Sequence, residues 1–148
     1  MKRSLSFLKN YIDKERVKTN IKGPISVINN DYNFVLDNIE SKSGIYIFVS
    51  KKHKFVYPKG NSSVIYIGKA SNLKRRIKEH LNNLSKVSPK EFWVYNRYNY
   101  MKMEGGFEIY YLTTIKNENP KYMESRAIED FYDSFFAIPV GNGAFSFR

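Results

Sequence analysis

Two short runs of β-branched and aromatic residues, followed at once by a helical pattern, constrain this chain more than any other feature of its sequence. The first run, residues 44–50, reads GIYIFVS, and the second, residues 64–68, reads VIYIG. This composition is typical of strands, and the loop between the runs contains Pro58 and Gly60. We therefore expect the two runs to pair as an antiparallel hairpin with a long tip.

A helix is expected directly after the hairpin. Apolar residues recur there at intervals of four, four and three, which places them on one face of a helix. These residues are Leu73, Ile77, Leu81 and Leu84, and Ser71 is the candidate N-cap.

Two polar residues interrupt this apolar face. Arg76 and His80 lie beside the apolar seam and four residues apart, so their side chains can point at one spot over the sheet. Local rules tend to fail at functional sites, which makes this pair a candidate site. A half-buried, hydrogen-bonded histidine is the alternative interpretation. Lys74 and Arg75 fall on or near the outer face, where they fit a solvated surface or a phosphate-binding surface.

The two strands also carry a pair of tyrosines. Alternation places Tyr46 and Phe48 on one face of the first strand, and Tyr66 and Gly68 on one face of the second. In a suitable register the two hydroxyls lie close together, and each needs a hydrogen-bond partner if it is covered. Two core aromatics are the alternative, in a chain with 12 tyrosines. Gly68 ends the strand where the helix begins, so the backbone there, with Lys69 beside it, can hold a phosphate.

The remaining pattern predicts an α+β fold with a small three-stranded antiparallel sheet flanked by helices. We expect the third strand over residues 107–115 and a last helix over roughly 121–136. Residues 1–20 predict a basic amphipathic helix. We divide the chain into a helical N-terminal extension, residues 1–40, packed on or beside the core, and a domain at 41–148. Two stretches stay open: residues 25–43 as a short strand or turn followed by a helix, and residues 86–104 as helix or irregular structure.

Charge and composition narrow the partners. The chain has 25 Lys and Arg against 14 Asp and Glu, a net charge of +11, which indicates a polyanionic partner, nucleic acid first and a membrane surface second. The absence of cysteine excludes a disulfide scaffold, a cysteine-ligated metal site and a cysteine nucleophile. No run approaches membrane-spanning length, and Lys9 interrupts the N-terminal apolar residues, so we expect a cytoplasmic protein.

Taken together, these residues resemble the GIY-YIG nuclease family. Its two tripeptides match residues 44–46 and 66–68, and the segment that continues to His80 is similar to the family's second motif without a gap. The resemblance covers about residues 44–142. It implies metal-dependent hydrolysis of DNA phosphodiester bonds with Mg²⁺ or Mn²⁺, and a homodimer on DNA is a hypothesis for cutting both strands. Restriction, mobile-element spread and repair all use this catalytic core, and we favour a restriction or mobile-element (homing-type) enzyme.

The resemblance also implies roles for individual residues. Tyr46 is the candidate general base for the attacking water, and Tyr66 would orient that water or a phosphate oxygen. Arg76 is similar to the family's helix arginine, which can donate two hydrogen bonds to phosphate. His80 is similar to its helix histidine and can take the proton of Tyr46.

A metal-binding glutamate is expected on the last helix, which offers two candidates. Glu124 and Glu129 are five residues apart, or about 140° around a helix, so both cannot face one site. Family members place an asparagine roughly a dozen residues after the glutamate, and Glu129 precedes Asn142 by 13. We therefore expect Glu129 to be the metal ligand, with Glu124 as the alternative. The expected substrate-binding residues are Lys69, Lys74, Arg75 and Asn142, the last pinning the terminal loop to the site.

Two other functions remain open. One is a non-catalytic nucleic-acid-binding domain that keeps the nuclease fold, and the other is a basic protein that binds a partner or a membrane surface through its N-terminal helix. Tyr46 and Tyr66 are 20 residues apart, longer than is usual in the family. The loop at 51–63, which carries four lysines, is therefore an insertion or an extended hairpin tip that could reach along DNA.

Overall fold

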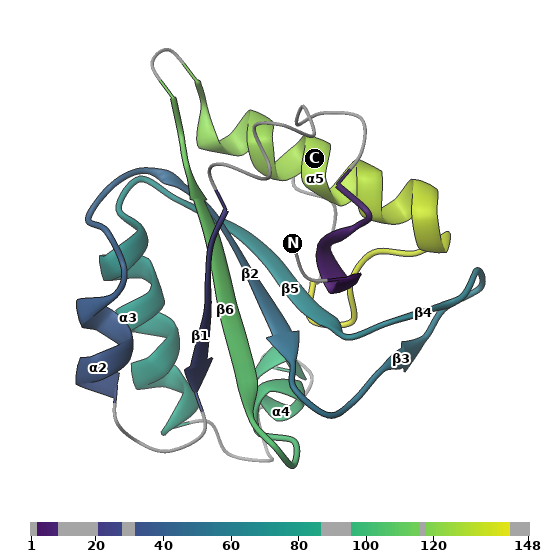
Figure 1. Ribbon diagram of the computed structural model, residues 1–148, viewed down its shortest axis with the longest axis horizontal. Coiled ribbons are helices and arrows are strands. Elements are labelled where there is room, and N and C mark those ends of the chain that lie inside the picture. The colour runs from purple at the N-terminus through teal and green to yellow at the C-terminus, as the bar shows by residue number, and fades with distance from the viewer. Residues whose placement is uncertain (1–2, 9–20, 28–31, 87–95, 116–117, 143–148) are drawn as a thin grey trace.

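The computed structural model of the protein describes residues 3–8, 21–27, 32–86, 96–115 and 118–142. Within them the chain forms a four-stranded antiparallel sheet with helices on both faces (Figure 1). The α+β class is therefore confirmed. In the same residues, no helix is both long enough and apolar enough to cross a membrane.

The main sheet is built around the predicted hairpin. Its two strands pair antiparallel, with Tyr46 opposite Gly68 and Phe48 opposite Tyr66, and the expected third strand pairs with the other edge of the first. In order across the sheet, the strands are β1 (Lys22–Val27), β6 (Phe107–Thr113), β2 (Gly44–Ser50) and β5 (Val64–Ala70).

The prediction of a three-stranded sheet was wrong, because the main sheet has a fourth strand, β1. β1 pairs antiparallel with β6, with Ile25 opposite Ile109, and Ile25 and Val27 are buried. Without this pairing, one edge of β6 would leave its backbone N–H and C=O groups without partners, which is costly. Part of the predicted N-terminal extension therefore belongs to the sheet.

The predicted N-terminal helix falls mostly on residues 9–20, outside the described part of the chain. Before it, Arg3–Leu5 form a short 3₁₀ turn, η1. Leu5, Phe7 and Leu8 are buried in the core on one face of the sheet. The chain before residue 40 thus contributes both a strand and core side chains.

Different helices cover the two faces of the sheet (Figure 1). One face carries α2 (Tyr32–Asp37) and α3 (Leu73–Leu84), and the other carries α5 (Pro120–Phe135). The short helix α4 (Asn96–Met101) lies within the stretch that the sequence left open, and contacts β2 and β5. As a result, α3, α4 and the edge strand β5 lie next to one another.

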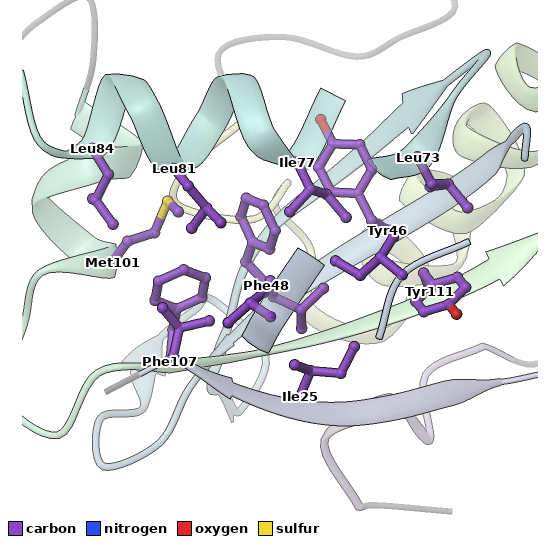
Figure 2. Close-up of a cluster of buried hydrophobic side chains, with 14 of the residues drawn as sticks. Ile25, Tyr46, Phe48, Leu73, Ile77, Leu81, Leu84, Met101, Phe107 and Tyr111 are labelled. Carbon is purple, nitrogen blue, oxygen red and sulfur yellow. The ribbon is translucent and has the colours of Figure 1, made fainter. Parts of the chain in front are cut away.

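The helix α3 forms as its periodicity predicts. Its four seam residues are buried and lie over the sheet (Figure 2). The N-cap is Asn72 rather than the predicted Ser71: the Asn72 side chain accepts a hydrogen bond from the Arg75 backbone N–H at 3.1 Å. Asn72 has the extended backbone that a cap requires, whereas the Ser71 hydroxyl accepts a bond from the Arg75 guanidinium instead.

The loop between β2 and β5 is an extended hairpin tip. Within it, β3 (Phe55–Val56) and β4 (Asn61–Ser62) pair antiparallel as a separate two-stranded sheet. The sequence prediction of a long tip is confirmed.

Candidate active site

The two predicted tyrosines lie side by side over the hairpin on the α3 face. Their ring centroids are 5.9 Å apart, and the Tyr46 hydroxyl is directed toward α3 (Figure 2). Gly68, which pairs with Tyr46 across the strands, makes this possible, because a Cβ there would overlap the Tyr46 ring and hydroxyl and also crowd Tyr66. The glycine is thus a steric requirement of the tyrosine pair.

His80 joins this pair to a third tyrosine. Its Nε2 lies 2.6 Å from the Tyr46 hydroxyl and its Nδ1 lies 2.9 Å from the hydroxyl of Tyr98 on α4. The Asn83 side-chain amide also donates to the Tyr98 hydroxyl, at 3.3 Å. A neutral imidazole carries one N–H, so it donates to one of the two hydroxyls and accepts from the other. The result is a buried hydrogen-bonded line from Tyr46 through His80 to Tyr98.

Burial sets the protonation of this line. Burial, followed by the charges of Arg76 and Arg97, lowers the pKa of His80 to about 3, so the imidazole is neutral at pH 7. Burial, together with the neighbouring Tyr66, raises the pKa of Tyr46 well above its ordinary value, although the charge of Arg76 opposes this shift. Both groups are therefore neutral, and Tyr46 acts on a proton only if its own can leave to His80.

Arg76 stands between this line and the protein surface. Its guanidinium donates to the Glu79 carboxylate at 2.8 Å, and both side chains are partly exposed. Tyr46 and His80, in contrast, have no exposed surface. Arg76 also lines a cleft of about 380 Å³, together with Lys69, Ala70, Ser71, Asn72, Arg75, Glu79 and the first residues of α5, Asn119, Pro120 and Lys121.

This cleft is basic, which partly matches the predicted substrate-binding residues. Lys69 and Arg75 line it and are exposed, whereas Lys74 does not line it. The cleft lies at the N-terminal end of α3, where backbone N–H groups and cationic side chains favour an anion. A phosphate is the chemical group that fits this combination.

The structure separates the two candidate carboxylates. Glu124 is only 6% exposed, whereas the Glu129 side chain is 47% exposed and pairs with Arg126 at 3.9 Å. Glu124 follows the cleft residues Pro120 and Lys121 by four and three positions, so the three share one helix face. Glu129 lies about 7.5 Å further along the helix axis. The geometry favours Glu124 over the predicted Glu129.

Asn142 has a structural contact rather than a free amide. Its Nδ2 donates to the carbonyl of Ile67 at 2.9 Å, and its Oδ1 accepts from the Ile67 N–H at 3.0 Å. The Gly141 N–H donates to the carbonyl of Ile65 at 2.7 Å. The asparagine therefore pins the terminal loop to β5, and both ends of its amide are committed to backbone groups.

Three residues that the structure brings to this site were not among the predicted site residues: Asn83, Arg97 and Tyr98. Arg97 and Tyr98 belong to the aromatic stretch whose structure the sequence left open. The one signal for them was the density of tyrosines around residue 98, which predicts burial but not a neighbour.

Metal ligands are few at this site. Among the residues that the structure describes, no cluster of three or more His, Asp or Glu side chains is suited to hold a metal ion. A cation that keeps most of its water shell, such as Mg²⁺, needs only one or two protein carboxylates. A single buried carboxylate beside a phosphate-sized basic cleft fits that kind of cation.

Comparisons with known proteins agree with this geometry. The sequence matches the GIY-YIG catalytic domain over residues 42–131. It is similar to UvrABC system protein C of Petrotoga mobilis (strain DSM 10674 / SJ95), with 33% identity over 89 residues. The match covers 60% of this chain but only 12% of that protein. No solved structure matches the chain significantly.

Proposed function

This chain belongs to the GIY-YIG catalytic-domain family of nucleases, and we propose that it is a metal-dependent DNA endonuclease that hydrolyses phosphodiester bonds. The observation that carries the proposal is the buried line of Tyr46, His80 and Tyr98 beside Arg76. Nucleic-acid binding alone does not require titratable groups in a closed hydrogen-bonded line. The net charge of +11 supports DNA as the substrate.

The proton path runs from the attacking water to His80. The Tyr46 hydroxyl accepts the water proton while its own proton moves over the 2.6 Å bond to Nε2 of His80, and Nδ1–H donates to Tyr98. The charges of Arg76 and Arg97 help to hold the pKa of His80 low in the free protein. A bound phosphate offsets these charges, so substrate binding raises the proton affinity of His80 at the moment when it is needed.

Arg76 would bind the phosphate that is cut. Its guanidinium already binds one carboxylate, Glu79, and can exchange it for phosphate oxygens with the same planar geometry. Because Tyr46 has no exposed surface, this exchange would also move the side chains that cover its hydroxyl. Tyr66, which is partly exposed beside Tyr46, would orient the water or a phosphate oxygen.

We infer that Glu124, rather than Glu129, holds the divalent cation, Mg²⁺ or Mn²⁺. Its burial and its place on the helix face that borders the basic cleft support this assignment. The cation would supply Lewis-acid stabilisation of the phosphate oxygens. Lys69 and Arg75 would bind neighbouring phosphates from the rim of the cleft.

Cleavage of supercoiled and linear DNA with Mg²⁺ or Mn²⁺ tests this proposal. We expect the wild type and Glu129→Gln to cut and Glu124→Gln to be inactive while still binding DNA. Loss of cutting in Glu129→Gln alone would return the ligand role to the residue expected from the sequence. DNA binding by the wild type without any metal-dependent cutting would favour the non-catalytic binding domain.

The finer assignments rest on the same activity. A restriction or mobile-element enzyme should cut at defined sequences, so mapping the cut ends tests that role against sequence-independent cutting. A homodimer on DNA should double the sedimenting protein mass when duplex is added. The cytoplasmic location belongs to the same proposal, since DNA is the expected substrate.

A further inference from the structure

Arg97, on α4, is placed against the tyrosine pair from the side of the sheet edge. Its guanidinium carbon lies 4.2 Å from the ring centroid of Tyr66, which in turn lies 5.9 Å from Tyr46 and 5.7 Å from His80 between ring centroids. The sequence pattern did not single out this arginine as a site residue. It therefore adds a positive charge, from outside α3, next to the tyrosine pair.

The terminal loop holds Arg97 in this position. A Cβ added at Gly141 would lie 3.0 Å from the Cβ of Arg97 and 2.6 Å from the Ile65 carbonyl oxygen. That loop is fixed to β5 by the backbone bond from Gly141 to Ile65 and by the two side-chain bonds of Asn142. Arg97 is thus packed between a pinned loop and an aromatic ring. Because its side chain is already ordered, binding a ligand would cost it little further conformational entropy.

The charge of Arg97 lacks the partner that Arg76 has. Among the described residues, the structure gives Arg97 no carboxylate, and its Nε is buried without a hydrogen-bond acceptor. Arg76, by comparison, is paired with Glu79 at 2.8 Å. A buried N–H donor without an acceptor costs free energy, so a phosphate that displaces the atoms covering Nε would gain by supplying that acceptor.

We propose that Arg97 is a second phosphate-binding arginine, which contacts the backbone of the DNA strand where that strand passes Tyr66. This inference rests on the proposed nuclease function and goes beyond it by naming a further substrate contact. A guanidinium that stacks on a ring keeps its edge available for two parallel hydrogen bonds to phosphate oxygens. Arg76 and Arg97 then both contact the strand, and both lower the pKa of His80 until phosphate is bound.

The salt dependence of DNA binding tests this contact without any cleavage. Affinity for a fluorescent duplex is measured in EDTA over a range of salt concentrations. Log affinity falls as log salt rises, and each phosphate contact makes this fall steeper by about 0.9. We expect Arg97→Gln and Arg97→Met to make this fall shallower by about 0.9, the contribution of one phosphate contact. Arg97→Lys, which keeps the charge, should retain it.

Arg126→Gln is the matched control. It removes the same charge from a partly exposed position on α5, about 200° around the helix from Glu124, and should leave the slope unchanged. Arg97→Met keeps the apolar part of the side chain against Tyr66, so it tests the contact if the glutamine variant fails to fold. Thermal unfolding of each variant is measured to separate the loss of the phosphate contact from a loss of folding.

The outcomes separate this inference from the proposed function. Equal slopes for both neutral Arg97 variants and Arg126→Gln would overturn the Arg97 contact, even if the wild type cuts DNA. A shallower salt dependence in the neutral Arg97 variants, with no metal-dependent cutting by the wild type, would support the contact and reject the nuclease. A wild type that binds no duplex would overturn both.

Discussion

The two faces of the main sheet both bury aromatic rings, but the rings interact differently on each face. Under α5, Phe131 packs against Phe7, Tyr57 and Phe135 with ring centroids 4.6 to 5.3 Å apart. The Tyr57 hydroxyl there accepts one bond, from the backbone N–H of Val140 at 3.0 Å.

Under α3, in contrast, the rings are linked through their polar atoms. Tyr46, His80 and Tyr98 form one hydrogen-bonded line, and the pKa of His80 falls to about 3. Burying polar groups in this way costs stability that an apolar core does not lose. The α5 face therefore serves stability, whereas the α3 face carries the residues to which we assign the proposed chemistry, although the aromatic content of the two faces is alike.

The largest effect expected from breaking this difference is on catalysis. Tyr46→Phe keeps the ring but removes the hydroxyl that contacts His80, so DNA cleavage should fall by about 10²- to 10⁴-fold. Single-turnover cleavage rates measure this loss. Tyr57→Phe makes the same change on the α5 face and should cost about 0.5 to 1.5 kcal/mol of stability while leaving the cleavage rate unchanged. Equal rates in the two variants would show that the faces do not divide the work as described.

A change to the α5 face should act on stability instead. Phe131 is fully buried, so Phe131→Ala should lower the free energy of unfolding by about 3 to 5 kcal/mol because it leaves a cavity among the rings. Urea unfolding followed by circular dichroism measures the change. Phe34→Ala, at a side chain that is 59% exposed, should cost less than about 1 kcal/mol. A small cost at Phe131 would mean that the α5 face collapses around the missing ring.

The third effect builds up gradually with pH, and it belongs to the α3 face. His80 has a folded-state pKa of about 3 against an ordinary value of 6.5, so the unfolded chain binds the proton first as pH falls. The stability of the wild type should therefore decline between pH 6.5 and 3, with a slope approaching about 1.4 kcal/mol per pH unit. The decline is measured relative to His80→Gln by urea unfolding at each pH.

The second histidine provides the control for this slope. His53 lies in the loop after β2, outside the line of Tyr46, His80 and Tyr98. The pH dependence of His53→Gln is measured beside that of His80→Gln, so that the effect of the buried line is compared with that of replacing any histidine. The same pH dependence in His80→Gln as in the wild type would contradict the burial of a neutral imidazole.

Much of the site followed from local pattern. Alternation placed Tyr46 and Tyr66 on one face of the hairpin, and helical spacing placed Arg76 and His80 beside the apolar seam; the structure brings all four together. These relations hold because side chains two apart on a strand, or four apart on a helix, share a face whatever the rest of the chain does. Their chemical roles stay predictions until the variants are measured.

Other features depended on contacts between distant segments. The fourth strand, β1, pairs with β6 between positions 80 to 89 residues apart in the sequence, and nothing in its six residues specifies that partner. The choice between the carboxylates depends on which end of α5 borders the cleft, so a count of residues to Asn142 favoured Glu129 where the geometry favours Glu124.

By itself, the sequence determined the α+β class, the hairpin, the amphipathic α3 and the family of this protein, because period-two and period-3.6 patterns and a compound motif are local properties. Only the tertiary structure decided that Tyr98 and Arg97 complete the surroundings of His80 and Tyr66. Those contacts arise from the packing of α4 on the edge of the sheet. Packing depends on shape and burial across the whole core, which no short segment encodes.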